Sequence, residues 1–425
     1  MRPEAALPLA RPRSHCPKSR RPARGNAVDK CARGPQHVRN TNKCSLYEHF
    51  CCRGDPPVVR PSDTVSRRGG GAEARERQMS RGGTDDHRAT RAVASGQRIR
   101  MRFAAIWIAL VVLVAVSAVL VPRSLQATSI LAIAPLAAFL AMTAMGEALV
   151  LMMRGIDLSI PAVITLSSSV ILGMTGGENG GLALAIVVAL ALSLVVGVIN
   201  GVLVALFKLN ALIVTLAVGT ILTGLVLWYR EGVAQEASVP PLLADWGEAR
   251  FLSINSAIWV AAALTAVLTV GLRLTTVGRR FVAVGANPRA AWIAGLPVTR
   301  HQVAAYAIAA TLYGVAGILL AAFIRNPTLE VGANYLLAPI AAAVLGGTAV
   351  TGGIGSMIAI GGAALFLTQL GQILRMLDLS TAIQFMIHGV AIALGMGLAN
   401  LRAGTLHAAL SRIFGRTADR IAGAP

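Results

Sequence analysis

The sequence predicts an all-α polytopic membrane protein with about ten transmembrane helices. Of the 425 residues, 55% are hydrophobic and only 14% are charged, whereas soluble proteins average about 25% charged residues. Apolar stretches close to the ~20 residues that cross a bilayer recur along the chain after residue 100. Arginine clusters occupy alternate loops between these stretches, which is typical of a chain that crosses a membrane many times.

Residues 1–100 form a basic segment that we expect to be disordered. They contain 22 of the 39 lysines and arginines and 9 of the 19 acidic residues, a net charge of +13. The segment is rich in Arg, Pro, Gly and Ser and shows no hydrophobic periodicity. It has neither interleaved aromatic residues nor a zinc-finger pattern, so nucleic acid is not an expected partner. Its five cysteines include no CxxC pair, and no metal site is predicted.

A start codon assigned too early would produce the same composition. Met79 opens a short polar leader before the first apolar stretch, and we expect translation to begin there or, alternatively, at Met101. The chain then divides into the basic segment 1–100, a transmembrane domain over residues 101–400 and a C-terminal tail over residues 401–425.

Ten apolar segments make up the transmembrane domain, and polar residues, prolines or glycines separate them. The first closes at Pro122 and Arg123, and the third ends at the turn GGENGG, residues 176–181. A polar loop, 230–253, follows the fifth, and a basic loop with a short helical stretch, 275–302, follows the sixth. The shortest spans are the third and the eighth, which ends in a glycine-rich turn. The ten are expected at 103–121, 130–153, 160–174, 182–207, 211–229, 254–272, 303–324, 335–345, 357–374 and 381–398.

The charges orient these spans. With the N-terminus in the cytoplasm, every even-numbered span ends inside, which places Arg154, Lys208, the basic loop and the basic tail there. The mixed loop 230–253 and the 325–330 connection then lie outside. Nine or eleven spans would put either the basic loop or the basic tail outside. We therefore predict that both termini are cytoplasmic.

Few polar side chains lie within the predicted spans or in the short loops that join them, and such groups usually face a cavity or a partner. Glu147, Asp157, Asn200 and Gln384 are the candidates for a translocation path or gate. A packing role for Glu147, and capping of free backbone N–H groups at a helix start for Asp157, stay open as alternatives. Gly197 and Gly201 form a GxxxG step that favours close helix packing.

The chain contains no recognisable catalytic or nucleotide-binding motif. It has four lysines, and none follows a glycine, so no GxxxxGK[ST] loop exists. HExxH and GxSxG are also absent. We expect a protein that is not an enzyme and that binds no cofactor of its own.

Four stretches in order resemble the permease subunits of bacterial ABC sugar importers of the ribose/xylose/galactoside type. The similarity covers about residues 103–398 and none of 1–100. The stretches are RGIDLS (Arg154–Ser159), INGVLVALFKLNALIVTLAVGTILTGL (Ile199–Leu225), VGANPRAAWIAGL (Val284–Leu296) and ANYLLAPIAAAVLGGTAVTGGIGS (Ala333–Ser356).

This resemblance implies a type II-like ABC importer permease fold in a bacterial inner membrane. It implies a separate ATPase subunit that binds ATP and Mg, a periplasmic solute-binding protein outside, and a second permease copy in a homo- or heterodimer. In that family the long cytoplasmic loop holds a coupling helix that docks on the ATPase. The matching positions are Asn287, Pro288, Arg289, Ala290, Ala291 and Gly295.

The chain departs from the family pattern at three places. Arg154 stands where the family most often has glycine, Ile160–Pro161 replaces Val-Gly, and residues 330–334 replace a glycine-rich lead-in to Tyr335. The sequence leaves open a permease of the same superfamily for branched-chain amino acids, nucleosides or another small solute. It also leaves open, as different classes, an ion-coupled secondary transporter and a membrane scaffold or receptor.

Overall fold

The computed structural model describes residues 103–233 and 238–380, with a few positions between 382 and 393. The basic segment 1–100, the tail 401–425 and most of the predicted tenth span, 381–398, lie outside the described residues.

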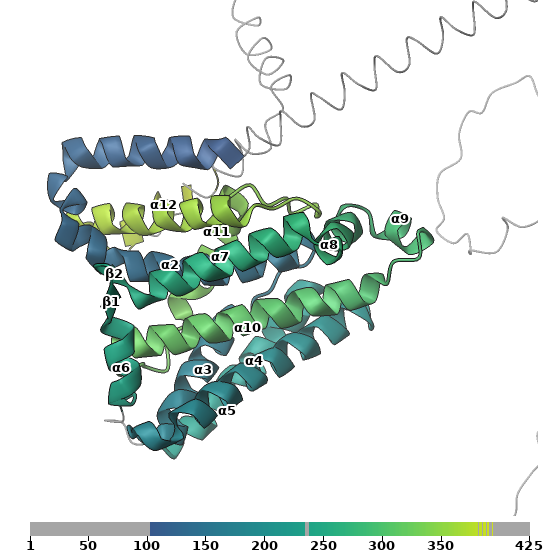
Figure 1. The fold of residues 1–425 in the computed structure, drawn as a ribbon, viewed down its shortest axis with the longest axis horizontal. Helices are drawn as coiled ribbons and strands as arrows, with labels where there is room; N and C mark the ends of the chain where they lie inside the picture. Colours follow the sequence, from purple (N-terminus) through teal and green to yellow (C-terminus); the bar gives the residue numbers. More distant parts are fainter. Residues whose placement is uncertain are drawn as a thin grey trace, which may run out of the picture. The chain divides into compact units, whose positions relative to one another are not determined.

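The described chain is a bundle of α-helices with one very short antiparallel hairpin (Figure 1). A helix at Phe103–Leu120 precedes the numbered elements. The main helices are α2 (Ala127–Met152), α3 (Ile160–Thr175), α4 (Leu182–Ala205), α5 (Ala211–Glu231), α6 (Pro241–Glu248), α7 (Ser256–Leu274), α8 (Thr276–Ala286), α9 (Pro288–Ile293), α10 (Val298–Ile324), α11 (Ala338–Leu345) and α12 (Met357–Met376). Strands β1 (Arg250–Phe251) and β2 (Ile254–Asn255) form the hairpin, and short 3-10 turns lie at Pro122–Leu125, Asn179–Gly181 and Ala333–Tyr335.

Seven helices of the described region are long and apolar enough to cross a membrane, and they coincide with seven predicted spans. The third predicted span is a shorter apolar helix at 160–175, and the eighth corresponds to shorter helical elements within 333–345. The all-α polytopic fold is therefore confirmed. Helix α3 begins only after the non-helical segment Gly155–Ser159, which we call the connector because it joins α2 to α3.

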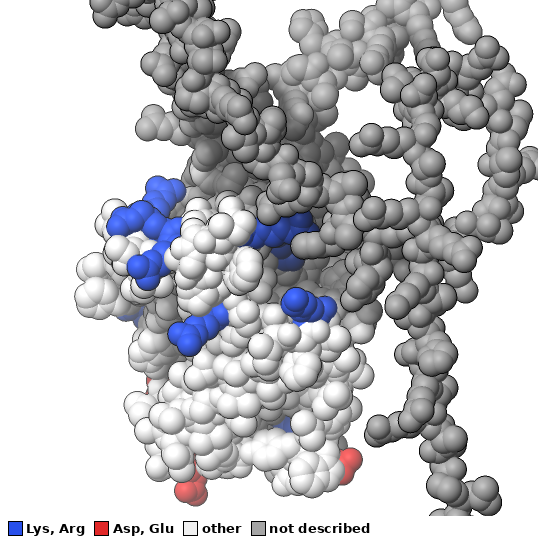
Figure 2. Space-filling model, turned by 90° about the vertical axis from the view of Figure 1, so that its right-hand side faces the viewer, with Lys and Arg blue, Asp and Glu red and all other residues white. Residues whose placement is uncertain are grey.

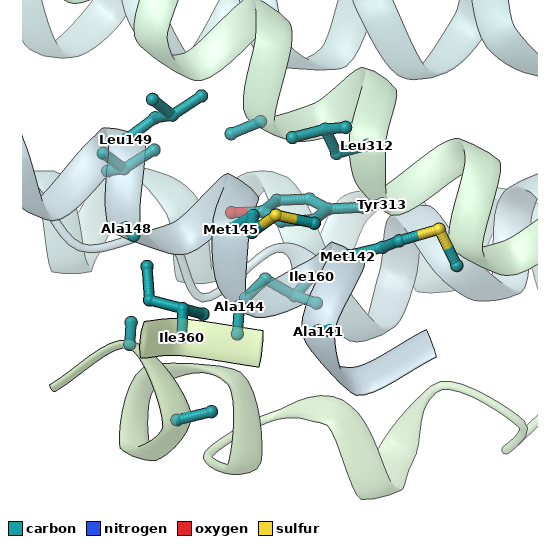
Figure 3. Close-up of a cluster of buried hydrophobic side chains, with 14 of the residues drawn as sticks. Ala141, Met142, Ala144, Met145, Ala148, Leu149, Ile160, Leu312, Tyr313 and Ile360 are labelled. Carbon is teal, nitrogen blue, oxygen red and sulfur yellow. The ribbon is translucent and has the colours of Figure 1, made fainter. Parts of the chain in front are cut away.

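Helices α2 and α10 form the centre of the bundle. Helix α10 packs against α4, α2 and α3, and α2 also packs against α11 and α12. Every residue of α2 from Ala137 to Met152 is buried. Figure 3 shows the ring of Tyr313, from α10, lying among Met142, Met145 and Ile160. Gly146 permits this contact, because a β-carbon there would lie 2.5 Å from the Tyr313 ring.

The bundle has two chemically different ends (Figure 1). Helices α8 and α9 lie at one end, and α6 with the hairpin lies at the other. At the α6 end, Arg325 forms an ion pair of 2.8 Å with Glu248, and its hydrogen bond holds the pKa of that carboxyl below the ordinary value. At the α8 end, basic residues dominate, since the sequence from Ala249 to Leu329 contains no Asp or Glu.

Three local features differ from the sequence predictions. Helix α10 begins at Val298, five residues before the predicted span, because the polar stretch 298–302 continues the helix beyond the apolar region. The eighth span is a 3-10 turn followed by α11 and not one helix. The polar loop 230–253 contains α6, whose apolar face, including Leu243 and Ala244, is buried.

The GxxxG step of α4 packs closely against α10 and gives a stability prediction. A β-carbon at Gly197 would lie 2.5 Å from the Tyr306 carbonyl oxygen, whereas one at Gly224 of α5 meets nothing within 4 Å. Alanine is more favourable than glycine in a helix interior by about 1 kcal/mol at either position. At Gly197 the added methyl group also overpacks the contact with α10, which costs about 1–3 kcal/mol. We expect Gly197→Ala to lower the apparent Tm in detergent and Gly224→Ala to leave it unchanged or raise it. Equal shifts would contradict this packing.

Candidate functional site

The structure separates the predicted site residues into two groups. The positions matched to the coupling helix lie on and beside α9, at the basic end of the bundle. Glu147, Asp157 and Asn200 come together in the interior, each with no exposed surface. Gln384 belongs to neither group: it donates from Nε2 to the carbonyl of Leu379 (2.8 Å), within its own stretch of chain.

Helices α8 and α9 are short, and side chains fix where each begins. Thr275 Oγ1 accepts a hydrogen bond from Gly278 N (3.0 Å) and caps α8. Asn287 Oδ1 accepts from Ala290 N (3.1 Å) and caps α9, with Pro288 at its first position. These caps satisfy N–H groups that a helix start leaves free. The sequence therefore specifies two separate helices with Asn287 between them.

Gly295 follows α9 and turns the chain toward α10. Its φ of +79° is in the left-handed region that favours glycine. Gly295 N donates to the Trp292 carbonyl (2.9 Å) and Leu296 N donates to the Ala291 carbonyl (3.0 Å). This pair of bonds is the Schellman arrangement of a helix C-terminus. The part of Gly295 in coupling stays a prediction.

The exposed surface of α9 differs from what the motif alone suggests. Arg289 and Ala290 are exposed, but Ala291 is only 5% exposed and packs into the core, so it cannot lie in a partner's groove in this arrangement. The most exposed large side chains are Trp292, at 73%, and Ile293, at 80%. A tryptophan and an isoleucine in a basic loop are the sequence signal that could have pointed to them.

The end of the bundle that holds α8 and α9 is basic. Figure 2 shows lysine and arginine side chains spread over this face, with the acidic residues in view at its lower edge. A hollow beside α9 is lined by Trp292, Gly295, Leu296, Pro297, Val298, Thr299 and Arg300. The surface thus combines two large apolar side chains with surrounding positive charge, a composition that suits a protein partner with an acidic rim.

The interior group holds the connector in place. Its three consecutive amides each donate to a side chain: Asp157 N to Glu147 Oε2 (3.3 Å), Leu158 N to Thr215 Oγ1 (2.9 Å), and Ser159 N to Asp157 Oδ1 (2.9 Å). A non-helical segment inside a membrane bundle needs such partners, because its amides have no acceptors within a helix. Side chains from α2 and α5, together with Asp157 itself, therefore stabilise the start of α3.

A chain of side-chain hydrogen bonds extends this group. Asn200 Nδ2 donates to Ser159 Oγ (2.9 Å), which donates in turn to Asp157 Oδ1 (2.6 Å). Tyr313 Oη donates to Glu147 Oε2 (3.3 Å). The helix α3 begins beyond Ser159, so Asp157 orders the turn before the helix and does not cap its first turn directly. We call Glu147, Asp157, Ser159, Asn200, Thr215 and Tyr313 the polar cluster.

Ser159, Thr215 and Tyr313 are members of the polar cluster that the sequence did not indicate. Serine and threonine are common in membrane helices, and Tyr313 became notable only through its contact with Glu147. Tyr306 precedes Tyr313 by seven residues, two helical turns, so the pair lies on one face of α10. That spacing is the sequence signal that could have identified the two tyrosines.

The polar cluster retains hydrogen-bonding capacity. Within the described part of the chain, Asp157 Oδ2 and Asn200 Oδ1 of the cluster are buried and have no hydrogen-bond partner, and the same holds for Tyr306 Oη, which lies beside Gly155 of the connector. Buried polar groups in a membrane protein are costly when they are unpaired, and such groups are usually functional. The cluster is thus a candidate site as well as a structural support.

Comparisons with known proteins agree on one family. A family model described as branched-chain amino acid transport system / permease component matches residues 129–403. The ribose import permease protein RbsC of Bacillus subtilis is 32% identical over 296 residues, which cover 68% of this chain and 90% of that protein. The corresponding protein of Escherichia coli K12 is 30% identical over 292 residues, 68% of this chain and 91% of that protein.

An arabinose permease gives a similar match. The L-arabinose ABC transporter permease protein AraH of Azospirillum brasilense is 32% identical over 290 residues, which cover 65% of this chain and 80% of that protein. No solved structure was found to match the chain.

Proposed function

The chain belongs to the branched-chain amino acid transport system / permease component family, and on that premise we propose that it is the transmembrane permease subunit of an ABC importer for a monosaccharide. The ribose and arabinose permeases named above support the substrate class, because they match over most of their length. The proposal excludes catalysis by this chain: a separate ATPase subunit binds ATP and Mg and hydrolyses the nucleotide.

The exposed pair Trp292 and Ile293 on α9 is the observation that best supports this function. Large apolar side chains at the end of a bundle, with Arg300 lining the same hollow as Trp292, are typical of a docking surface, and aromatic anchors contribute most to such interfaces. We propose that α9 is the coupling helix and that Asn287, Pro288, Arg289, Ala290 and Gly295 shape or flank the docked surface. Ala291 serves by anchoring α9 to the bundle.

The orientation and the other partners follow from the two ends of the bundle. The basic end, with α8 and α9, faces the cytoplasm of a bacterial cell, as do both termini. The end with α6 and the Arg325–Glu248 pair faces the periplasm and meets a solute-binding protein. A second permease copy completes the translocation path at the dimer interface, and lipid surrounds the assembly.

We propose that the polar cluster acts in transport through the connector. Glu147, Asp157 and Asn200 hold the connector between the helices, so a shift of the connector changes the packing of α3, α4 and α5 together. Such coordinated helix movement is what alternating access requires. Gln384 remains a candidate for the path itself, on the segment that follows α12.

Uptake of labelled solutes by the native host tests the function. We expect deletion of the gene to remove ATP-dependent uptake of one monosaccharide, from a panel of ribose, arabinose and xylose, and to leave leucine uptake unchanged. Loss of leucine uptake with normal sugar uptake would favour the branched-chain amino acid alternative, which the family description suggests. Uptake that persists after ATP depletion and stops when ion gradients are removed would indicate a secondary transporter.

A further inference from the structure

Arg154 joins the end of α8 to the end of α2. Its Nε donates to the carbonyl of Gly285 (3.0 Å) and its Nη2 donates to the carbonyl of Ala286. These are the last two residues of α8, whose carbonyls have no partner within the helix. A guanidinium is well suited to this position because it offers several donors and its positive charge favours the negative end of a helix.

The backbone of Arg154 adopts a strained conformation to make these contacts. Its φ is +67°, in the left-handed region that disfavours side chains with a β-carbon. A glycine would adopt this backbone more readily, but it would lack the two hydrogen bonds to α8. The turn itself therefore does not require arginine, and the contribution of this side chain is the pair of hydrogen bonds to the end of α8.

Three segments meet around Arg154 with their backbones in direct contact. Gly353 N, from the glycine-rich turn between α11 and α12, donates to the Met152 carbonyl at the end of α2 (2.9 Å). A β-carbon at Gly285 would lie 2.1 Å from that same oxygen, and one at Gly353 would lie 2.7 Å from Ala286 Cα. No side chain separates the segments, so a displacement of one must move the others, because close-packed contacts do not compress.

The connector begins at the residue after Arg154. Its amides are bonded to Glu147 on α2 and Thr215 on α5, and Ser159 accepts from Asn200 on α4. The three segments that meet around Arg154, which we call the junction, therefore lie between α8–α9 and the buried polar cluster. The chain is continuous from one to the other over the few residues between Arg154 and Asp157.

We propose that Arg154 is a positioning residue that clamps the end of α8 to the connector and so transmits movement of α8–α9 to the polar cluster. The inference rests on the proposed function, since it takes the ATPase as the source of that movement. The docked ATPase displaces α9, α8 follows, and Arg154 pulls the connector with it. The glycines at positions 285 and 353 keep the junction tight.

The first test uses the permease alone and needs no ATPase. Hydrogen exchange is measured on Arg154→Ala, on Arg154→Lys and on Arg279→Ala, which removes a charge from an exposed arginine of the same helix. We expect Arg154→Ala to speed exchange both at residues 285–287 and at the connector, Arg154→Lys to have a smaller effect, and Arg279→Ala to have none at the connector. Faster exchange at 285–287 without any change at the connector would overturn the proposed link.

The second test measures coupling in the complete transporter with its ATPase and binding protein. We expect Arg154→Ala to assemble with the ATPase and hydrolyse ATP at close to the wild-type rate, while solute transported per ATP falls about tenfold. Arg154→Lys should recover part of that ratio. An unchanged ratio in Arg154→Ala would overturn the inference. Failure of the wild-type chain to recruit an ATPase would instead refute the proposed function, and the exchange result would still decide whether the clamp exists.

Discussion

Replacing Trp292 and Ile293 together by alanine is expected to weaken binding of the ATPase subunit about 30-fold or more and to remove transport. The estimate follows from the ~2 kcal/mol or more that a buried aromatic anchor contributes to an interface. Both side chains are among the most exposed of the described residues, so their removal should leave the bundle intact. The measurement is a titration of purified ATPase against permease in nanodiscs.

Phe251→Ala serves as the matched control for this double variant. The exposed fraction of Phe251, 68%, is similar to the 73% of Trp292, but Phe251 lies in the hairpin at the opposite end of the bundle. We expect its loss to leave ATPase binding unchanged. If the double variant binds the ATPase as tightly as wild type, α9 is not the docking helix, and the exposed pair requires a different partner.

Replacing Asp157 by alanine is expected to lower the apparent Tm by several degrees and to reduce solute uptake to below about a tenth of the wild-type rate. The change leaves Ser159 N without its acceptor and breaks the bond from Ser159 Oγ, and each orphaned buried group costs about 1–3 kcal/mol. Asparagine retains an oxygen at the Oδ1 position. We therefore expect Asp157→Asn to keep a Tm near the wild-type value. Thermal denaturation in detergent, followed by uptake in cells, measures both effects.

The comparison of the two Asp157 variants separates hydrogen bonding from charge. If Asp157→Asn is as unstable as Asp157→Ala, the polar cluster depends on the negative charge and not on the acceptor. If Asp157→Asn folds normally and does not transport, the carboxylate itself acts in the translocation path. Normal folding and transport would identify Asp157 as a structural acceptor for the connector.

Much of the bundle is predictable from sequence because the membrane imposes a local constraint. A span must be apolar over its whole length, so hydropathy alone locates α4 or α7 to within a few residues. The start of α10 was harder, because polar residues continue that helix past the apolar region. Hydropathy also does not locate α6, because this helix is too short to cross a membrane and is recognisable only by the face that it buries.

The candidate site was less predictable because its contacts join distant parts of the chain. The sequence identified Glu147, Asp157 and Asn200 as isolated polar residues, but Tyr313, which contacts Glu147, lies 166 positions further along the chain. The motif at 284–296 implies a short helix but does not say which side of that helix faces outward, and Ala291 proved to be buried. The clamp at Arg154 depends on carbonyls 131 and 132 residues away, which no local pattern reveals.

The first measurement is affinity purification of the chain from gently solubilised membranes of its native host. It tests whether the chain is a transport subunit driven by a partner ATPase. We expect an ATP-binding-cassette ATPase to co-purify with the wild-type chain in stoichiometric amount and to be lost with Trp292→Ala/Ile293→Ala. Recovery of a folded permease with no ATPase, under conditions that preserve other membrane complexes of the same host, would contradict it.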